Sequence, residues 1–89
     1  MDSQWFVYLL RCNDNSLYAG VTKDLQRRVN EHNHHNKIGA KYTRVRRPVS
    51  LIYYETVSSR SKACQREYQL KQLSKQQKEK LISVSTIKK

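Results

Sequence analysis

The stretch Tyr18–His32 constrains the fold most, because a strand pattern turns into a helix pattern within it. In the helical part, Leu25 and Val29 lie roughly 40° apart at about 100° per residue, and they define a core-facing side. Arg28 and His32 are also spaced i,i+4, and they border that side instead of lying opposite it. A helix whose charges serve solubility alone would keep them on the far face, so this polar pair needs its own explanation.

The ends of this helix follow from local signals. Thr22 is the predicted N-cap, Asp24 lies in the first turn where it complements the helix dipole, and the helix is expected to end near Asn33. The strand before it, residues 17–21, contains Gly20, which marks either a bend or the close approach of another group. The solvent-facing side of the helix is predicted to hold Gln26, Arg27, Asn30 and Glu31.

Two further strands are predicted. Residues Trp5–Arg11 are apolar at nearly every position, which favours a central strand, and turn formers at 13–16 join it to 17–21 as an antiparallel hairpin. The segment 49–57 is also apolar on both sides and is expected to be covered and central. Its predicted faces are Val49, Leu51 and Tyr53 on one side, with Ile52 and Tyr54 on the other.

Two helices complete the chain. Ser58 and Ser59 supply a cap for a helix from about Arg60 to Leu73, and Ser74 caps a short helix at 75–82. The apolar stripe of the first is predicted to hold Ala63, Cys64, Leu70 and Leu73. Residues 83–89 are expected to fray. The β-β-α-β-α-α order predicts a single α+β domain over 1–89, with its core at about 5–82.

Charge is distributed unevenly along the chain. Residues 1–32 carry four acids and four bases, so the net charge of +11 arises from 33–89, which carry fourteen bases and three acids. Such asymmetry favours a polyanionic partner, most often nucleic acid. A lysine-rich solubilising surface or a ribosome-associated role is the alternative.

Cysteine usage and hydropathy indicate the compartment. Cys12 and Cys64 form no CxxC pair and no zinc-ligand spacing, so both are expected to be small buried side chains in a reducing environment. The apolar run at 5–10 is too short for a signal peptide, and none approaches the roughly 20 residues of a membrane span. We therefore expect a cytoplasmic protein with no membrane partner.

Glu67 is the sharpest anomaly in the pattern, because it lies on an apolar stripe, four residues after Ala63 and three before Leu70. An unpaired carboxylate there is costly and should meet a cation. Two interpretations remain open. One is an ion pair with Arg28 or Lys71; the other is ligation of Mg²⁺ or Mn²⁺, which needs only one or two carboxylates.

Other polar residues also allow two interpretations. Arg28 either sends its head into water or holds a planar donor fork for a phosphate. His32 by itself fits a helix-end histidine favoured by the dipole. The histidines at 32, 34 and 35 share no helix face, so a solvated loop is favoured over a metal site. Tyr8 and Tyr18 are by default core tyrosines with hydroxyls at the rim.

Taken in order, these positions resemble a known family. Phe6-Val7-Tyr8, Tyr18-Ala19-Gly20, Lys23-Asp24-Leu25-Gln26-Arg27-Arg28, His32 and Glu67 follow the order of the GIY-YIG nuclease domain. The segments Gly39-Ala40-Lys41-Tyr42-Thr43-Arg44, Arg47-Pro48 and Arg66–Leu73 resemble its small stand-alone bacterial branch, the UPF0213 family. The chain is also similar to the nuclease domain of the eukaryotic Slx1 subunits. The resemblance covers about residues 5–82.

The resemblance implies a three-stranded antiparallel sheet flanked by helices and a role for each matching residue. Tyr8 would activate the attacking water or relay its proton, Tyr18 would support the site, and Arg28 would stabilise charge on the phosphate. His32 would lie near the scissile phosphate. Glu67 would hold a single Mg²⁺ or Mn²⁺. The implied activity is metal-dependent hydrolysis of DNA phosphodiester bonds, with structure or strand preference and low sequence specificity.

A basic connection supports that expectation. Residues 33–48 form a long segment without a clean period, and such connections are usually functional or disordered. Its bases can contact phosphates, Tyr42 can stack on a nucleobase, and Gly20 would let substrate or metal approach the hairpin. The predicted nucleic-acid contacts are Lys23, Arg27, Lys41, Tyr42, Arg44, Arg46 and Arg47.

The sequence departs from the family pattern in ways that keep a second hypothesis open. The first motif lacks its glycine, and no asparagine follows Glu67, where many members have one. A non-catalytic nucleic-acid-binding module that kept the fold is therefore the alternative function. Because family enzymes with defined targets carry an extra DNA-binding domain, we expect a protein partner to supply specificity to a monomer or weak dimer. DNA is favoured over RNA as the substrate.

Overall fold

A computed structural model of the chain describes residues 4–85. Its strands are β1 (Trp5–Arg11), β2 (Leu17–Thr22) and β3 (Ser50–Val57). Its helices are α1 (Leu25–His34), α2 (Lys41–Arg44), α3 (Arg60–Gln72) and α4 (Lys75–Ser85). The predicted α+β class is confirmed, with α2 as a short additional helix inside the connection at 33–48.

The three strands form one antiparallel sheet in the order β2-β1-β3. The prediction that β1 is central is confirmed. The same prediction for β3 is wrong, because β3 lies at an edge of the sheet and Tyr54 is 48% exposed. In a sheet of three strands only one can have neighbours on both sides, so apolar content could not make both central.

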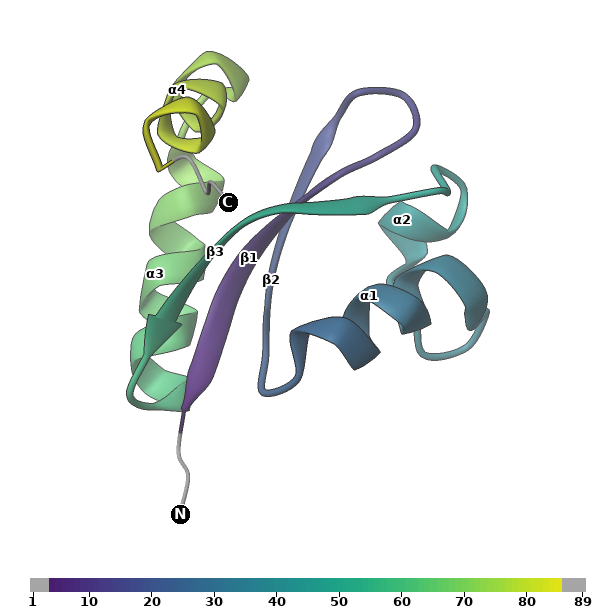
Figure 1. Ribbon diagram of the computed structural model, residues 1–89, viewed down its shortest axis with the longest axis horizontal. Coiled ribbons are helices and arrows are strands. Elements are labelled where there is room, and N and C mark those ends of the chain that lie inside the picture. Colours follow the sequence, from purple (N-terminus) through teal and green to yellow (C-terminus); the bar gives the residue numbers. More distant parts are fainter. Residues whose placement is uncertain (1–3, 86–89) are drawn as a thin grey trace.

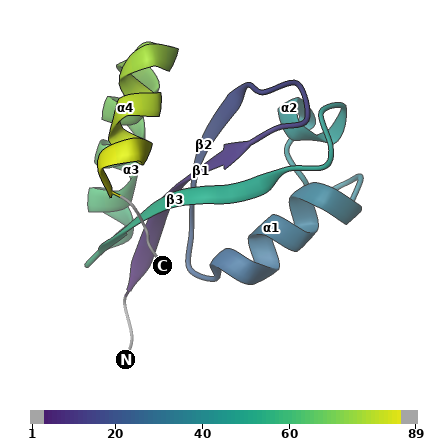
Figure 2. The ribbon, with the colours of Figure 1, turned by 45° about the horizontal axis from the view of Figure 1, so that its top comes forward.

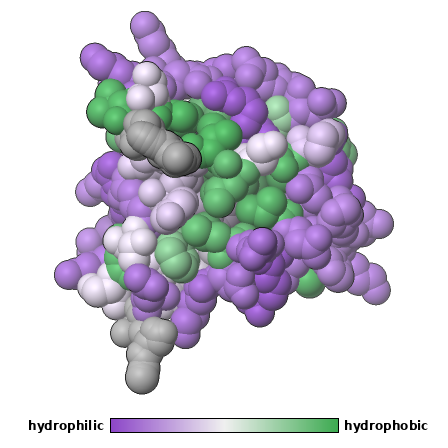
Figure 3. Space-filling model, viewed as in Figure 1, coloured by the Kyte–Doolittle hydropathy of each residue, from purple (hydrophilic) through white to green (hydrophobic). Residues whose placement is uncertain are grey.

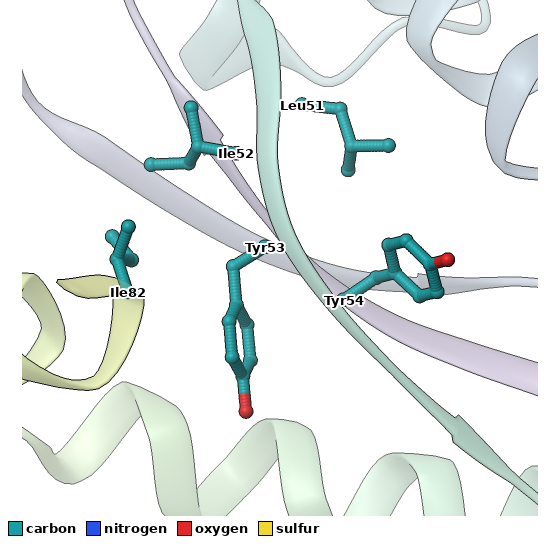
Figure 4. Close-up of a pocket in the computed structure, with 5 residues that line it drawn as sticks. All are labelled: Leu51, Ile52, Tyr53, Tyr54 and Ile82. Atoms are coloured by element: carbon teal, nitrogen blue, oxygen red, sulfur yellow. The ribbon is translucent and has the colours of Figure 1, made fainter. Parts of the chain in front are cut away.

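A bulge in β3 also overturns its predicted faces. Tyr53 pairs with Leu9 and Leu51 pairs with Leu10, so Ile52 is an extra residue in the register. An extra residue reverses the alternation of side chains beyond it. Leu51 and Tyr53 therefore point to opposite sides of β3 (Figure 4), whereas strict alternation would place both on one face.

Helices cover both faces of the sheet. Figures 1 and 2 show α3 on one side, with α1 and α2 on the other. Because side chains alternate along a strand, β1 supplies two core clusters. The cluster beneath α3 consists of Val7, Leu9, Ala19, Tyr53, Ala63 and Leu70. The cluster beneath α1 consists of Tyr8, Leu10, Cys12 and Val49, with Leu25 and Val29 packed against it.

The caps of the helices match the predictions in part. Asp24, not Thr22, is the N-cap of α1, and its carboxylate accepts a hydrogen bond of 3.1 Å from the Arg27 N–H. Thr22 is buried, and its Oγ1 instead accepts from the Asp24 N–H. Ser59 caps α3 as predicted.

The end of the chain and one cysteine differ from expectation. Helix α4 continues to Ser85, so 83–85 are not a frayed tail, and the rest of that prediction, 86–89, lies outside the described residues. Cys12 is buried as predicted, but Cys64 is exposed. The stripe of α3 is narrower than the sequence pattern indicates: Ala63 and Leu70 are buried, and the neighbouring Cys64 turns toward solvent.

An apolar groove of about 500 Å³ lies beside β3, and Figure 3 shows the apolar surface over this strand. Its walls are Leu51, Ile52, Tyr53, Tyr54 and Ile82. None of these residues belongs to the polar cluster around Tyr8 described below. Among residues 4–85, no helix is long and apolar enough to span a bilayer.

Candidate active site

The side chain of Tyr8 lies across the neighbouring strand at Gly20, its partner in the β1–β2 register. A Cβ added to Gly20 would come within 2.5 Å of the Tyr8 hydroxyl oxygen and 2.6 Å of Cζ. No side chain fits there, so the glycine is needed for the Tyr8 hydroxyl to reach this place. Of the two interpretations of Gly20, the structure shows a close approach, made by the Tyr8 side chain; an approach of substrate or metal to Gly20 stays a prediction.

The Tyr8 hydroxyl meets a buried histidine. Its oxygen lies 2.9 Å from Nε2 of His32, and Nδ1 of His32 lies 2.7 Å from Oγ1 of Thr43. The Thr43 hydroxyl in turn donates to the Ala40 carbonyl oxygen at 3.1 Å. His32 lies in the last turn of α1, as expected of a helix-end histidine, but it is completely buried and is therefore not an ordinary one.

Burial shifts both groups toward their neutral forms. Desolvation raises the pKa of Tyr8 to about 12, although the nearby Arg28 guanidinium opposes that shift. Desolvation, together with the positive charge of Arg28, lowers the pKa of His32 to about 4. At neutral pH the pair is therefore a protonated phenol facing an uncharged imidazole that can accept a proton.

Arg28 lies beside this pair, and hydrogen bonds to two acceptors fix one nitrogen of its guanidinium. Its Nη1 donates to Glu31 Oε1 at 2.8 Å and to the Ile38 carbonyl oxygen at 2.7 Å. Glu31 is consequently drawn inward, with a side chain only 15% exposed, so its predicted place on the solvent-facing side is wrong. Both of these hydrogen bonds use Nη1, and the guanidinium also interacts with the Tyr8 hydroxyl.

Glu67 reaches the same region from the opposite face of the sheet. Its side chain is 24% exposed and its carboxylate lies 3.3 Å from the Lys71 ammonium, so its ion-pair partner is Lys71 and not Arg28. The negative charge of Glu67 is near enough to raise the pKa of Tyr8, as the smallest of the contributions. A solvent-accessible carboxylate with one exposed lysine beside it can still bind a divalent cation.

Glu67 is the candidate carboxylate for a metal at this site. Residues 4–85 contain no group of three or more His, Cys, Asp and Glu side chains that could hold an ion. This fits Mg²⁺ or Mn²⁺, which take one or two carboxylates and complete their shell with water and substrate phosphate. It does not fit zinc, which needs three or four protein ligands.

Aromatic rings extend the site outward from His32. The Tyr18 ring meets His32 edge-on, with centroids 5.2 Å apart, and stacks on Tyr42 at 5.7 Å. The Arg46 guanidinium lies 3.9 Å from the Tyr42 ring centre. Tyr42 thus has an aromatic and a cationic neighbour, yet it remains 38% exposed. Its stacking on a nucleobase stays a prediction.

The basic connection is tied to α1. Arg47 donates to the His32 and His35 carbonyl oxygens at 2.7 and 3.0 Å, and to Asn36 Oδ1 at 3.1 Å. Arg44 donates to the Asn36 carbonyl oxygen. These guanidinium groups satisfy carbonyl groups that the end of a helix leaves without partners, so they are partly structural.

The other predicted nucleic-acid contacts vary in how free their charges are. Arg46 forms an ion pair with Asp14 at 3.0 Å. Lys23 lies 5.6 Å from the Trp5 ring centre, and Arg27 is largely exposed beside Glu31. Lys41 is exposed at the start of α2. The contact of all these residues with nucleic acid stays a prediction.

The structure thus brings Tyr8, Tyr18, Arg28 and His32 together, with Glu67 close by. Sequence reasoning missed Thr43, which is fully buried against His32. The segment 41–44 was part of the family resemblance, but nothing in its local pattern shows that a threonine there meets a histidine eleven residues earlier. Only the folding of the connection back onto α1 makes this contact.

These features define a small α+β domain with a polar site at the β2 edge of its sheet. The family model described as the GIY-YIG catalytic domain matches residues 4–80, so the chain belongs to this nuclease-type family. Its bacterial relatives are UPF0213 proteins, and the family recognised from the sequence is confirmed.

Two relatives and two solved structures illustrate the similarity. A UPF0213 protein of Desulfotalea psychrophila is 52% identical over 81 residues, covering 91% of this chain and 73% of the relative. One from Staphylococcus epidermidis is 53% identical over 77 residues, covering 86% and 92%. The solution structure of a UPF0213 protein from Bacillus halodurans has a TM-score of 0.58 at 41% identity, covering 91% of this chain and 84% of that one. A protein structure from E. faecalis has a TM-score of 0.62 at 34% identity, covering 100% and 95%.

Proposed function

We propose that this protein is a divalent-metal-dependent endonuclease that hydrolyses phosphodiester bonds in DNA. The observation that supports this most directly is the 2.9 Å contact between the Tyr8 hydroxyl and Nε2 of the buried His32. A neutral imidazole beside a phenol gives a proton a place to go, which hydrolysis by water requires. A module that only binds nucleic acid has no need of such a pair.

Tyr8 and His32 act together as a proton relay in this proposal. A phenol whose pKa is raised to about 12 is protonated at neutral pH and cannot accept a proton without losing its own. It can take a proton from the attacking water while its own passes to Nε2 of His32. The water becomes the nucleophile, and the imidazolium formed keeps its hydrogen bond to Thr43.

In this proposal Arg28 and Glu67 stabilise the negative charge of the phosphate. Arg28 is held by Glu31 and Ile38 through Nη1, so its other donors can face the equatorial oxygens of the phosphate, where negative charge grows during attack. Glu67 would hold the single Mg²⁺ or Mn²⁺, which when bound supplies Lewis-acid stabilisation of the phosphate and leaving oxygen. Lys71 would have to move away from that carboxylate for the metal to bind.

The test is nicking of supercoiled plasmid, branched DNA and single-stranded DNA with Mg²⁺ or Mn²⁺. Tyr8→Phe removes the relay hydroxyl and should lower the rate roughly 100-fold or more. Its matched control is Tyr53→Phe, because Tyr53 is another buried tyrosine whose hydroxyl bonds Glu55 on the far face of the sheet. Equal cleavage by wild type and both variants would indicate contamination and contradict the proposal.

A second pair of variants tests the metal carboxylate. Glu67→Gln should abolish metal-dependent cleavage, whereas Glu79→Gln, which alters another glutamate paired with a lysine four residues away, should retain it. Salt-dependent binding by all variants with cleavage by none would support the alternative, a nucleic-acid-binding module. Absence of binding at moderate salt would contradict both functions.

A further inference from the structure

Thr43 is placed to control the proton on His32. It lies in the four-residue helix α2 and is completely buried. Its hydroxyl oxygen is 2.7 Å from His32 Nδ1 and 3.1 Å from the Ala40 carbonyl oxygen. A hydroxyl has one proton to donate and can also accept. Which neighbour receives that proton decides the direction of every bond in the chain that ends at Tyr8.

The acceptor at one end fixes the direction. A carbonyl oxygen can only accept, so the contact with Ala40 takes the Thr43 proton. The Thr43 oxygen must then accept from His32, which places the ring proton of neutral His32 on Nδ1. Nε2 is left with a lone pair, and the Tyr8 hydroxyl donates to it.

The opposite direction fails at Tyr8. If Thr43 donated to Nδ1, the Nε2–H of His32 would donate to the Tyr8 oxygen, on which the Arg28 guanidinium also acts as a donor. The phenolic proton of Tyr8 would then have no acceptor, because among residues 4–85 its partners are His32, which would be the donor, and Arg28, which can only donate. A buried unpaired donor costs about 1–3 kcal/mol, so the first direction is favoured.

We propose that Thr43 is a positioning residue that holds His32 in its Nδ1–H tautomer, so that Nε2 stays open to receive the Tyr8 proton. The catalytic part of this inference rests on the proposed nuclease function. The tautomer itself does not, because it follows from the hydrogen bonds alone.

The segment around Thr43 is built to hold it under α1. Gly39 packs so closely that an added Cβ would lie 2.7 Å from the carbonyl oxygens of Glu31 and His35. Arg47 fastens the far end of the connection to the His32 carbonyl oxygen at 2.7 Å. Thr43 is thus anchored on both sides by contacts to the same helix that carries His32, which suits a residue that orients an imidazole.

The experiment is ¹⁵N NMR of histidine-labelled protein near pH 7, where the protonated and bare nitrogens of a neutral imidazole have well-separated shifts. His32→Asn assigns the signals. Wild type and Thr43→Ser should show His32 protonated at Nδ1. Thr43→Val, which removes the acceptor at similar volume, should show it at Nε2 or as a mixture. Thr56→Val alters an exposed strand threonine and should leave the signals unchanged. Backbone amide spectra report whether each variant is folded.

Nuclease assays on the same samples separate the two proposals. Thr43→Val should lose roughly 100-fold in cleavage rate and Thr43→Ser should recover most of it. An Nε2–H tautomer in wild type, or an Nδ1–H tautomer retained in folded Thr43→Val, would overturn the role of Thr43. If Thr43→Val does not fold, the wild-type tautomer still decides the inference. The expected tautomers without cleavage by any protein would support the hydrogen-bond direction and overturn the nuclease function.

Discussion

The Tyr8 hydroxyl and the His32 imidazole share a buried hydrogen bond of 2.9 Å that joins the central strand to α1. The two residues are 24 positions apart, and their rings meet at a steep angle of 69°. The contact depends on a glycine beneath one ring and a threonine behind the other. Substitution of these neighbours can therefore test the role of the pair.

Adding a methyl group beneath Tyr8 should disable the pair. Gly20→Ala places a Cβ 2.5 Å from the Tyr8 hydroxyl oxygen, so the ring must move. We expect a loss of about 1–3 kcal/mol in the free energy of unfolding, measured by urea denaturation, and loss of cleavage. In a Tyr8→Leu background the same change should have little effect on stability. Equal effects in both backgrounds would show that the strain does not come from Tyr8.

The buried histidine should make stability depend on pH. Burial lowers the pKa of His32 to about 4 from its ordinary 6.5, so as the pH falls below 6.5 the unfolded chain binds the proton first. The contribution of His32 to the free energy of unfolding should therefore decrease between pH 6.5 and 4, by on the order of 3 kcal/mol, and stay constant at lower pH. Urea denaturation over a pH series measures this.

Carboxylates contribute at lower pH. The Arg11 guanidinium lowers the pKa of Glu79 to about 2 from 4.5, so its stabilisation is present above pH 4.5 and is lost as the pH falls toward 2. The slope between pH 6.5 and 4.5 should hence belong to His32 and be absent in His32→Asn. A wild-type protein without that slope would contradict the burial of an uncharged imidazole.

Releasing Arg46 should strengthen binding to nucleic acid. Asp14 pairs with this guanidinium at 3.0 Å, and Asp14→Asn removes the charge. We expect tighter DNA binding, with the slope of log affinity against log salt steeper by about one unit. Arg46→Ala should shift binding in the opposite direction. Fluorescence anisotropy over a salt series gives both quantities, and an unchanged slope in Asp14→Asn would exclude Arg46 as a phosphate contact.

Asp24, the N-cap of α1, should contribute to stability, although the sequence pattern predicts Thr22 as the cap. Asp24→Ala removes the carboxylate that accepts from the Arg27 N–H, and should lower the free energy of unfolding by about 0.5–2 kcal/mol. Asp24→Ser keeps a side-chain acceptor and should retain most of the stability. Thermal unfolding of the three proteins tests the assignment, and equal stability of the alanine and serine variants would refute it.

Local pattern predicted much of the candidate site. The spacing of Arg28 and His32 beside the stripe of α1, and the carboxylate of Glu67 among apolar positions, both identified residues that the fold gathers near Tyr8. These signals can be recognised in the sequence because helical periodicity depends only on residues close together in the chain. The order of strands and helices was predictable for the same reason.

Which distant residues meet was decided by the tertiary structure. The sequence allowed Glu67 to meet Arg28 or Lys71; Lys71 is its neighbour one turn along α3, and the packing of α3 on the face opposite α1 keeps Glu67 from pairing with Arg28. The bulge at Ile52 and the edge position of β3 depend on the register with β1, which no pattern within β3 contains. Arg47 was expected at a phosphate, yet its donors bind the end of α1.

The sequence by itself determined the element order, the family and the polar residues beside the apolar stripes of the helices, because each follows from the spacing of residues along the chain. Tertiary structure alone decided that His32 is buried and uncharged, that the Tyr8 ring occupies the space above Gly20, and that Thr43 stands behind the imidazole. Burial and hydrogen-bond direction depend on segments distant in sequence meeting in space. Tyr18–His32 is therefore one wall of a site whose chemistry is set by β1 and by the connection that folds back under α1.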